Sequence, residues 1–69
     1  MQLPVWMFGK YYNVIYVYKD EYNQMMMEVY NMNGDTPQFF GVQPCSYDLS
    51  VMKPLSSPMK DKLDRFRNR

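Results

Sequence analysis

The stretch YYNVIYVY, residues 11–18, alternates β-branched and aromatic side chains and therefore predicts a β-strand with apolar groups on both faces. Such a strand either has both faces covered within the fold or leaves an aromatic surface open to another molecule. The main functional question for this chain is therefore which tyrosines remain exposed.

The chain has 69 residues, which predicts a single domain spanning residues 1–69. A domain of this size buries only about 60% of the surface that its unfolded chain exposes, so a homo-oligomer remains an open alternative. Cys45 is the only cysteine and histidine is absent, which excludes an intramolecular disulfide and the usual zinc, copper and haem ligand sets. We expect no cofactor and no metal.

The lone thiol of Cys45 favours a reducing compartment, so we expect a cytoplasmic protein. The apolar segment at the N-terminus ends at Gly9-Lys10, far short of a membrane span, and it has no basic leader or small-residue cleavage site. We expect no membrane contact.

The pattern predicts a mainly β, α+β fold: a small antiparallel sheet, or an SH3-like or OB-like barrel, of four or five strands with one C-terminal helix. Asn33-Gly34 favours a tight hairpin turn, and Pro37 and Pro44 predict that the strand between them is short or at an edge. The expected strands cover residues 3–8, 11–19, 24–32 and 38–43, and residues 47–53 form either a fifth strand or an irregular crossing.

The closing helix is predicted over residues 58–68. Ser57 is the expected N-cap, Pro58 suits the first helical position, and Asp61 is placed in the first turn. The apolar positions recur at i, i+4 and i+7 and form one stripe that is expected to pack on the sheet: Met59, Leu63 and Phe66.

Two registers compete for the hairpin between the second and third strands. With an odd loop, Lys19 faces Asn23 and the other cross-strand pairs are Val17 with Met25, Ile15 with Met27, and Asn13 with Val29. With a four-residue loop, Lys19 faces Gln24 and the tyrosines enter the core. The odd register is favoured, because Ile and Val can be buried without a polar partner whereas a tyrosine hydroxyl needs one.

In the favoured register an aromatic and methionine-rich face points outward, and this composition is typical of protein contact surfaces. The candidate partner-binding residues on this face are Tyr12, Tyr16, Tyr18, Met26 and Tyr30. The alternative is that the C-terminal helix covers the same face.

The C-terminal segment has a different charge from the rest of the chain. Residues 59–69 carry five basic and two acidic side chains, whereas residues 1–58 carry three basic and five acidic ones. The basic side chains either extend along the apolar stripe into solvent or contact phosphates or an acidic protein surface. The candidate basic patch consists of Lys62, Arg65, Arg67 and Arg69.

Catalysis is not indicated. A serine nucleophile needs a base, histidine is absent, and the acidic residues are scattered. A methyl-lysine cage is a further hypothesis, with aromatic residues of the first two strands as its walls: Trp6, Phe8, Tyr11 and Tyr12.

The sequence therefore favours a non-catalytic protein-binding module that occludes or recruits a macromolecule, as small phage-encoded inhibitors and accessory factors do. The alternative is a nucleic-acid-binding module that uses the basic helix and exposed tyrosines. Pairing of two copies through an open strand edge near Phe39 and Phe40 also remains open.

Overall fold

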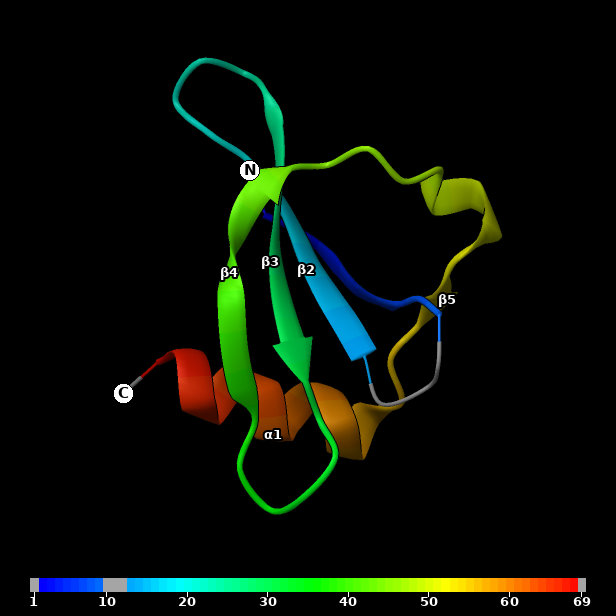
Figure 1. The fold of residues 1–69 in the computed structure, drawn as a ribbon, viewed down its shortest axis with the longest axis vertical. Coiled ribbons are helices and arrows are strands. Elements are labelled where there is room, and N and C mark those ends of the chain that lie inside the picture. Colours follow the sequence, from blue (N-terminus) through cyan, green and yellow to red (C-terminus); the bar gives the residue numbers. More distant parts are fainter. Residues whose placement is uncertain (1, 10–12, 69) are drawn as a thin grey trace.

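A five-stranded antiparallel sheet forms the body of the protein in the computed structural model, which describes residues 2–9 and 13–68 (Figure 1). A 3-10 helix, η1 (Leu49–Val51), and one α-helix, α1 (Ser57–Arg67), complete the fold. The predicted α+β fold with a C-terminal helix is confirmed. The strands are β1 (Gln2–Met7), β2 (Asn13–Lys19), β3 (Met25–Asn31), β4 (Gln38–Pro44) and β5 (Lys53–Pro54).

The strand order in the sheet is β4-β3-β2-β1-β5. Strands β1 to β4 follow one another as an antiparallel meander, and the chain then returns so that the short β5 pairs with the other side of β1. In the described part of the chain β4 and β5 are therefore the two ends of the sheet, and β4 has a neighbour on one side only.

Both faces of the sheet are covered. Helix α1 runs across one face, roughly perpendicular to the strands (Figure 1). Val14 and Tyr16 belong to the cluster on the helix side, whereas Ile15 and Val17 belong to a second cluster, against which Leu49 of the long β4–β5 connection packs. The alternation of side chains along β2 therefore supplies two cores, because successive residues of a strand point to opposite faces.

The β2–β3 hairpin has an odd loop, as favoured, but its register differs by two residues from the predicted one. Lys19 pairs with Met25 rather than with Asn23. The five-residue loop is held by Asp20, whose Oδ1 accepts hydrogen bonds from the backbone N–H groups of Tyr22 and Gln24, each 2.9 Å long. Asn23 adopts a φ of 65°, which asparagine tolerates better than most residues.

The remaining pairs are shifted in the same way: Val17 pairs with Met27, Ile15 with Val29, and Asn13 with Asn31. A shift of two residues leaves every side chain on its predicted face, because the side-chain period of a strand is two.

Residues 47–53 do not form the fifth strand that was one of the two predictions. The chain crosses irregularly through η1, and the fifth strand forms afterwards at Lys53–Pro54. The Asp48 carboxylate accepts hydrogen bonds from the backbone N–H and the hydroxyl of Ser50, 3.0 and 2.7 Å long. Such local bonds offer the backbone an alternative to strand pairing.

The β3–β4 connection is wider than the predicted tight turn at Asn33-Gly34. Asn31 pairs with Gln38, so residues 32–37 form a six-residue loop. Gly34 has a φ of 129°. Met32 is buried in the helix-side core, and the Asn33 N–H donates to Oδ1 of Asn31. Met32 thus anchors the first residue of the loop in the core.

Helix α1 begins one residue earlier than predicted. Ser56, not Ser57, is the N-cap residue, and its side chain makes no capping hydrogen bond. Pro58 therefore occupies the second helical position and Asp61 lies beyond the first turn. No helix in the described ranges has the length and apolar character needed to span a membrane.

Candidate functional site

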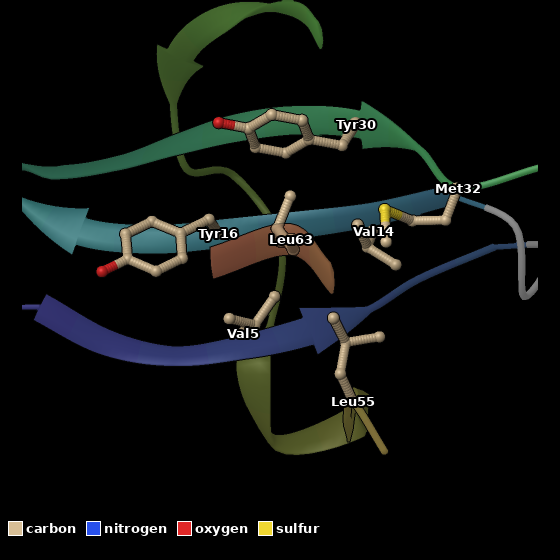
Figure 2. Packing of buried hydrophobic residues seen from close by; sticks show 7 residues of the cluster. All are labelled: Val5, Val14, Tyr16, Tyr30, Met32, Leu55 and Leu63. Carbon is tan, nitrogen blue, oxygen red and sulfur yellow. The ribbon is translucent and has the colours of Figure 1, made fainter. Parts of the chain in front are cut away.

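The tyrosine face that was predicted to be open lies beneath α1. Tyr16 and Tyr30 are each 4% exposed, so the expectation that they point into solvent is wrong. The alternative prediction, that the helix covers this face, describes the structure. Figure 2 shows Leu63 of α1 lying among Val14, Tyr16 and Tyr30.

The apolar stripe of the helix explains this cover. Leu63 is fully buried, and Met59 and Phe66 pack at the margins of the same cluster. The ring of Phe66 meets Tyr30 edge-on, with 6.1 Å between ring centroids, an arrangement that aromatic pairs prefer.

The other candidate partner-binding residues do not form an open patch either. Tyr18 and Met26 face each other on β2 and β3 and are half-buried, and Tyr18 packs at the edge of the helix-side cluster. Tyr12 lies outside the described residues. The structure does not bring the predicted set together as one exposed surface.

A charged network under the helix gives the Tyr30 hydroxyl a hydrogen-bond partner and places a cation over the Tyr16 ring. Nε of Arg67 donates a hydrogen bond to Oε1 of Glu28 at 2.8 Å, and the Tyr30 hydroxyl donates to the same oxygen at 2.6 Å. The Arg67 guanidinium carbon lies 3.5 Å from the centroid of the Tyr16 ring. Arg67 thus binds α1 to β2 and β3 through an ion pair and a cation–π contact.

The network shifts the pKa values of its members. Burial by itself would raise the pKa of Glu28, but the hydrogen bonds from Arg67 and Tyr30 outweigh it and hold that pKa below 4.5. Burial and the hydrogen bond to Glu28 raise the pKa of Tyr30 to about 12. Burial would lower the pKa of Arg67, but its bond to Glu28 raises it instead. All three groups therefore keep their ordinary charge states at neutral pH.

The residues of the candidate basic patch have different environments in the structure and do not form one cluster of free cations. Arg67 belongs to the charged network, Lys62 Nζ donates to the backbone oxygen of Gly34 at 2.7 Å, and Arg65 is exposed. Arg69 lies outside the described residues. Lys60, on the same helix, is paired with Asp64 at 2.8 Å. Two members of the predicted patch, Lys62 and Arg65, therefore retain positive charge with no carboxylate in ion-pair contact among residues 2–9 and 13–68.

A groove with a volume of about 400 Å³ lies between α1 and the β3–β4 loop, and we call it the α1 groove. Figure 1 shows this loop, in green at the bottom, next to the helix. Lys62 and Arg65 place their positive charges along the groove, and Asp35 supplies one negative charge. The lining includes Asp35, Thr36 and Pro37 from the loop and Lys62, Arg65 and Phe66 from α1.

A second surface lies on the edge strand β4. Phe39, Phe40 and Val42 are 50%, 66% and 48% exposed, and we call these three residues the β4 surface. The register shifts between the pairs of Val29 with Gly41 and Tyr30 with Phe39, so Phe40 is the extra residue of a β-bulge. The signal for this surface was present in the sequence, because an uncharged strand between two prolines carries adjacent phenylalanines.

Two of the aromatic residues proposed for a methyl-lysine cage, Trp6 and Phe8, make packing contacts instead. Trp6 and Phe8 pack against the core on the face opposite α1, and Phe8 lies against Tyr47 with 4.8 Å between ring centroids. Tyr11 and Tyr12 lie outside the described residues. In the described part of the chain, no three histidine, cysteine, aspartate or glutamate side chains gather as metal ligands.

Comparisons of this chain with protein-family models, with curated proteins and with solved structures find no significant match.

Proposed function

We propose that this chain is a non-catalytic protein-binding module that uses the β4 surface to occlude or recruit a macromolecular partner. The observation that carries the proposal is the exposure of Phe39, Phe40 and Val42 together on an edge strand that contains no charged residue. Large apolar groups gathered at one place on a small protein mark an interaction site more often than scattered ones do.

Side chains, rather than an added strand, make the contact in this proposal. The bulge at Phe40 interrupts the regular backbone of β4, and neither Pro37 nor Pro44 has an N–H group to donate. Bulges and prolines are the features by which edge strands avoid pairing with other strands. The phenylalanine rings remain available because their exposure does not depend on the backbone hydrogen bonds.

The proposal is tested by affinity capture from the source cell, with nuclease present and with mass spectrometry as the readout. The baits are the wild-type protein, Phe40→Ala, and the control Tyr22→Ala, which removes a ring that is 81% exposed in the β2–β3 loop. We expect one protein to be retained in stoichiometric amount by wild type and control, and its affinity to fall about 30-fold for Phe40→Ala, as for an interface residue worth about 2 kcal/mol.

Circular dichroism should show the same fold for all three baits, because both substituted rings are exposed. The proposal is refuted if Phe40→Ala captures the same proteins in the same amounts as wild type.

The nucleic-acid alternative has the positive charges of Lys62 and Arg65 beside the α1 groove in its favour. Two phosphate contacts predict a logarithmic salt slope of only about −1.8 for duplex DNA, so binding by these residues alone would be weak at physiological salt. A much steeper slope, which Arg65→Ala reduces by about one unit, would support this alternative over protein binding.

A further inference from the structure

We propose that the α1 groove binds carboxylate side chains of an acidic segment of the partner protein, and that Arg65 is the group that recognises them. This inference rests on the proposed protein-binding function and assigns it a second contact site.

Two of the basic residues of α1 already have acidic partners. Lys60 pairs with Asp64 within the helix, and Arg67 pairs with Glu28 of the sheet. Lys62 and Arg65 border the groove together, and within the described chain neither forms an ion pair. Among the described residues, Asp35 is the only acidic one in the lining, so Lys62 and Arg65 give the groove a net positive charge that suits an anionic group.

The two cations differ in what they can contribute. Lys62 Nζ is held by the backbone oxygen of Gly34, which fixes its charge at the loop side of the groove. Arg65 is exposed, and its guanidinium has no hydrogen-bond partner among the described residues. A guanidinium forms two parallel hydrogen bonds to a carboxylate, so Arg65 provides geometric recognition while Lys62 adds a positioned charge.

The rest of the lining favours a peptide segment over a nucleic acid. Pro37 is buried and Phe66 half-buried, and together they offer an apolar wall to the aliphatic part of a bound side chain. Asp35 in the lining and the exposed Asp61 on the same helix would repel a continuous phosphate backbone. A carboxylate at Arg65 brings one negative charge into the groove, whereas a nucleic acid carries a negative charge at every nucleotide and would bring several past both acidic residues.

The groove lies beside the β4 surface, because Pro37 of its lining is two residues before Phe39 in the chain. The ring of Tyr30 lies 5.4 Å from the ring of Phe39 on β4 and 6.1 Å from that of Phe66 in the groove, measured between centroids. One partner can therefore cover Phe39 and place an acidic segment in the groove. Such a combination of an apolar anchor with a charged neighbour is common in protein interfaces.

The test is a titration of the ¹⁵N-labelled protein, followed by ¹H–¹⁵N NMR spectra. The probe is a short blocked peptide of alternating glutamate and leucine, and the comparison ligands are the same peptide with glutamine in place of glutamate, inorganic phosphate and a short oligothymidine. We expect saturable shifts at Thr36, Lys62 and the Nε–H of Arg65 with the acidic peptide, and at least tenfold weaker binding of the glutamine peptide.

Arg65→Gln should weaken binding of the acidic peptide about tenfold or more, and Arg65→Lys should restore only part of it. Lys60→Gln is the matched control, because it removes a helix cation that lies outside the groove lining. This variant should bind the acidic peptide with the same affinity as wild type. Since Arg65 and Lys60 are both exposed, all variants should remain folded.

The inference is overturned if the acidic peptide gives no saturable shifts at the groove, if the glutamine peptide binds equally well, or if Lys60→Gln weakens binding as much as Arg65→Gln. Tighter binding of oligothymidine, with a steep salt dependence, would replace it with the nucleic-acid alternative. Phe40→Ala should not change binding of the peptide. The peptide titration therefore tests the groove alone, and the capture experiment with Phe40→Ala tests the β4 surface alone.

Discussion

Replacement of Arg67 by methionine tests how strongly the C-terminal helix depends on one charged contact. Methionine keeps much of the aliphatic stem but removes the guanidinium, which bonds to Glu28 at 2.8 Å and lies 3.5 Å from the centre of the Tyr16 ring. Glu28 would keep the hydrogen bond from Tyr30 but lose its cation. The substitution therefore leaves a largely buried carboxylate without a neutralising charge.

The magnitude follows from the burial of the pair. The side chains of Arg67 and Glu28 are each 18% exposed. Breaking a fully buried pair costs about 3–5 kcal/mol, and an exposed pair is worth about 0.2–1 kcal/mol, so we expect about 2 kcal/mol here. Loss of the contact with Tyr16 adds about 0.5–1 kcal/mol. For a domain of this length, the total corresponds to a fall in melting temperature of about 10 °C or more.

The assay is urea unfolding followed by circular dichroism, with thermal unfolding as a second measurement. Lys60→Met is the matched control, because its ion pair with Asp64 lies at the surface, where such pairs contribute little to stability, and its unfolding free energy should stay close to that of wild type. Adding Glu28→Gln to Arg67→Met should recover part of the lost stability, since it removes the unpaired charge. A loss below about 0.5 kcal/mol for Arg67→Met, or one equal to that of Lys60→Met, would refute this reasoning.

Two further predictions concern the same helix-covered face. Because the pKa of Glu28 in the folded protein lies below its ordinary value of 4.5, its carboxylate stabilises the fold above that pH and the contribution is lost as pH falls through the folded-state pKa. Glu28→Gln should therefore flatten the acid side of the pH profile of the unfolding free energy, and an unchanged profile would contradict the assignment. Leu63→Ala should lower the unfolding free energy by about 2–5 kcal/mol in urea titrations, because Leu63 is fully buried, whereas Val51→Ala, at a residue 74% exposed, should stay within about 0.5 kcal/mol of wild type.

Local sequence patterns were sufficient for most of the secondary structure. Alternation along residues 11–18 and the spacing of Met59, Leu63 and Phe66 predicted a strand and a docked helix that the structure contains. At two places where the prediction was wrong, a single aspartate carboxylate accepts hydrogen bonds from nearby residues. Asp48 bonds to Ser50 and replaces a strand by η1, and Asp20 sets a five-residue loop that shifts the β2–β3 register.

The candidate site was less predictable than the fold. The faces of β2 were assigned correctly, yet Tyr16 and Tyr30 were expected in solvent because a buried hydroxyl needs a partner. The structure supplies that partner for Tyr30 in Glu28, and it neutralises Glu28 with Arg67, which lies 39 residues further along the chain. Nothing in the local pattern distinguishes Arg67 from Arg65, which remains exposed.

The sequence by itself determined which segments are extended, which one is helical and which side chains of β2 share a face, because these properties depend on residues within a few positions of one another. Only the tertiary structure decided which of those faces the helix covers and which aromatic residues stay accessible. That outcome depends on Leu63 of α1 packing on the face of the sheet against Val14 and Tyr30, and on Arg67 reaching Glu28. Both contacts join segments that are far apart in the chain. This packing leaves the side chains of Phe39 and Phe40 uncovered on β4.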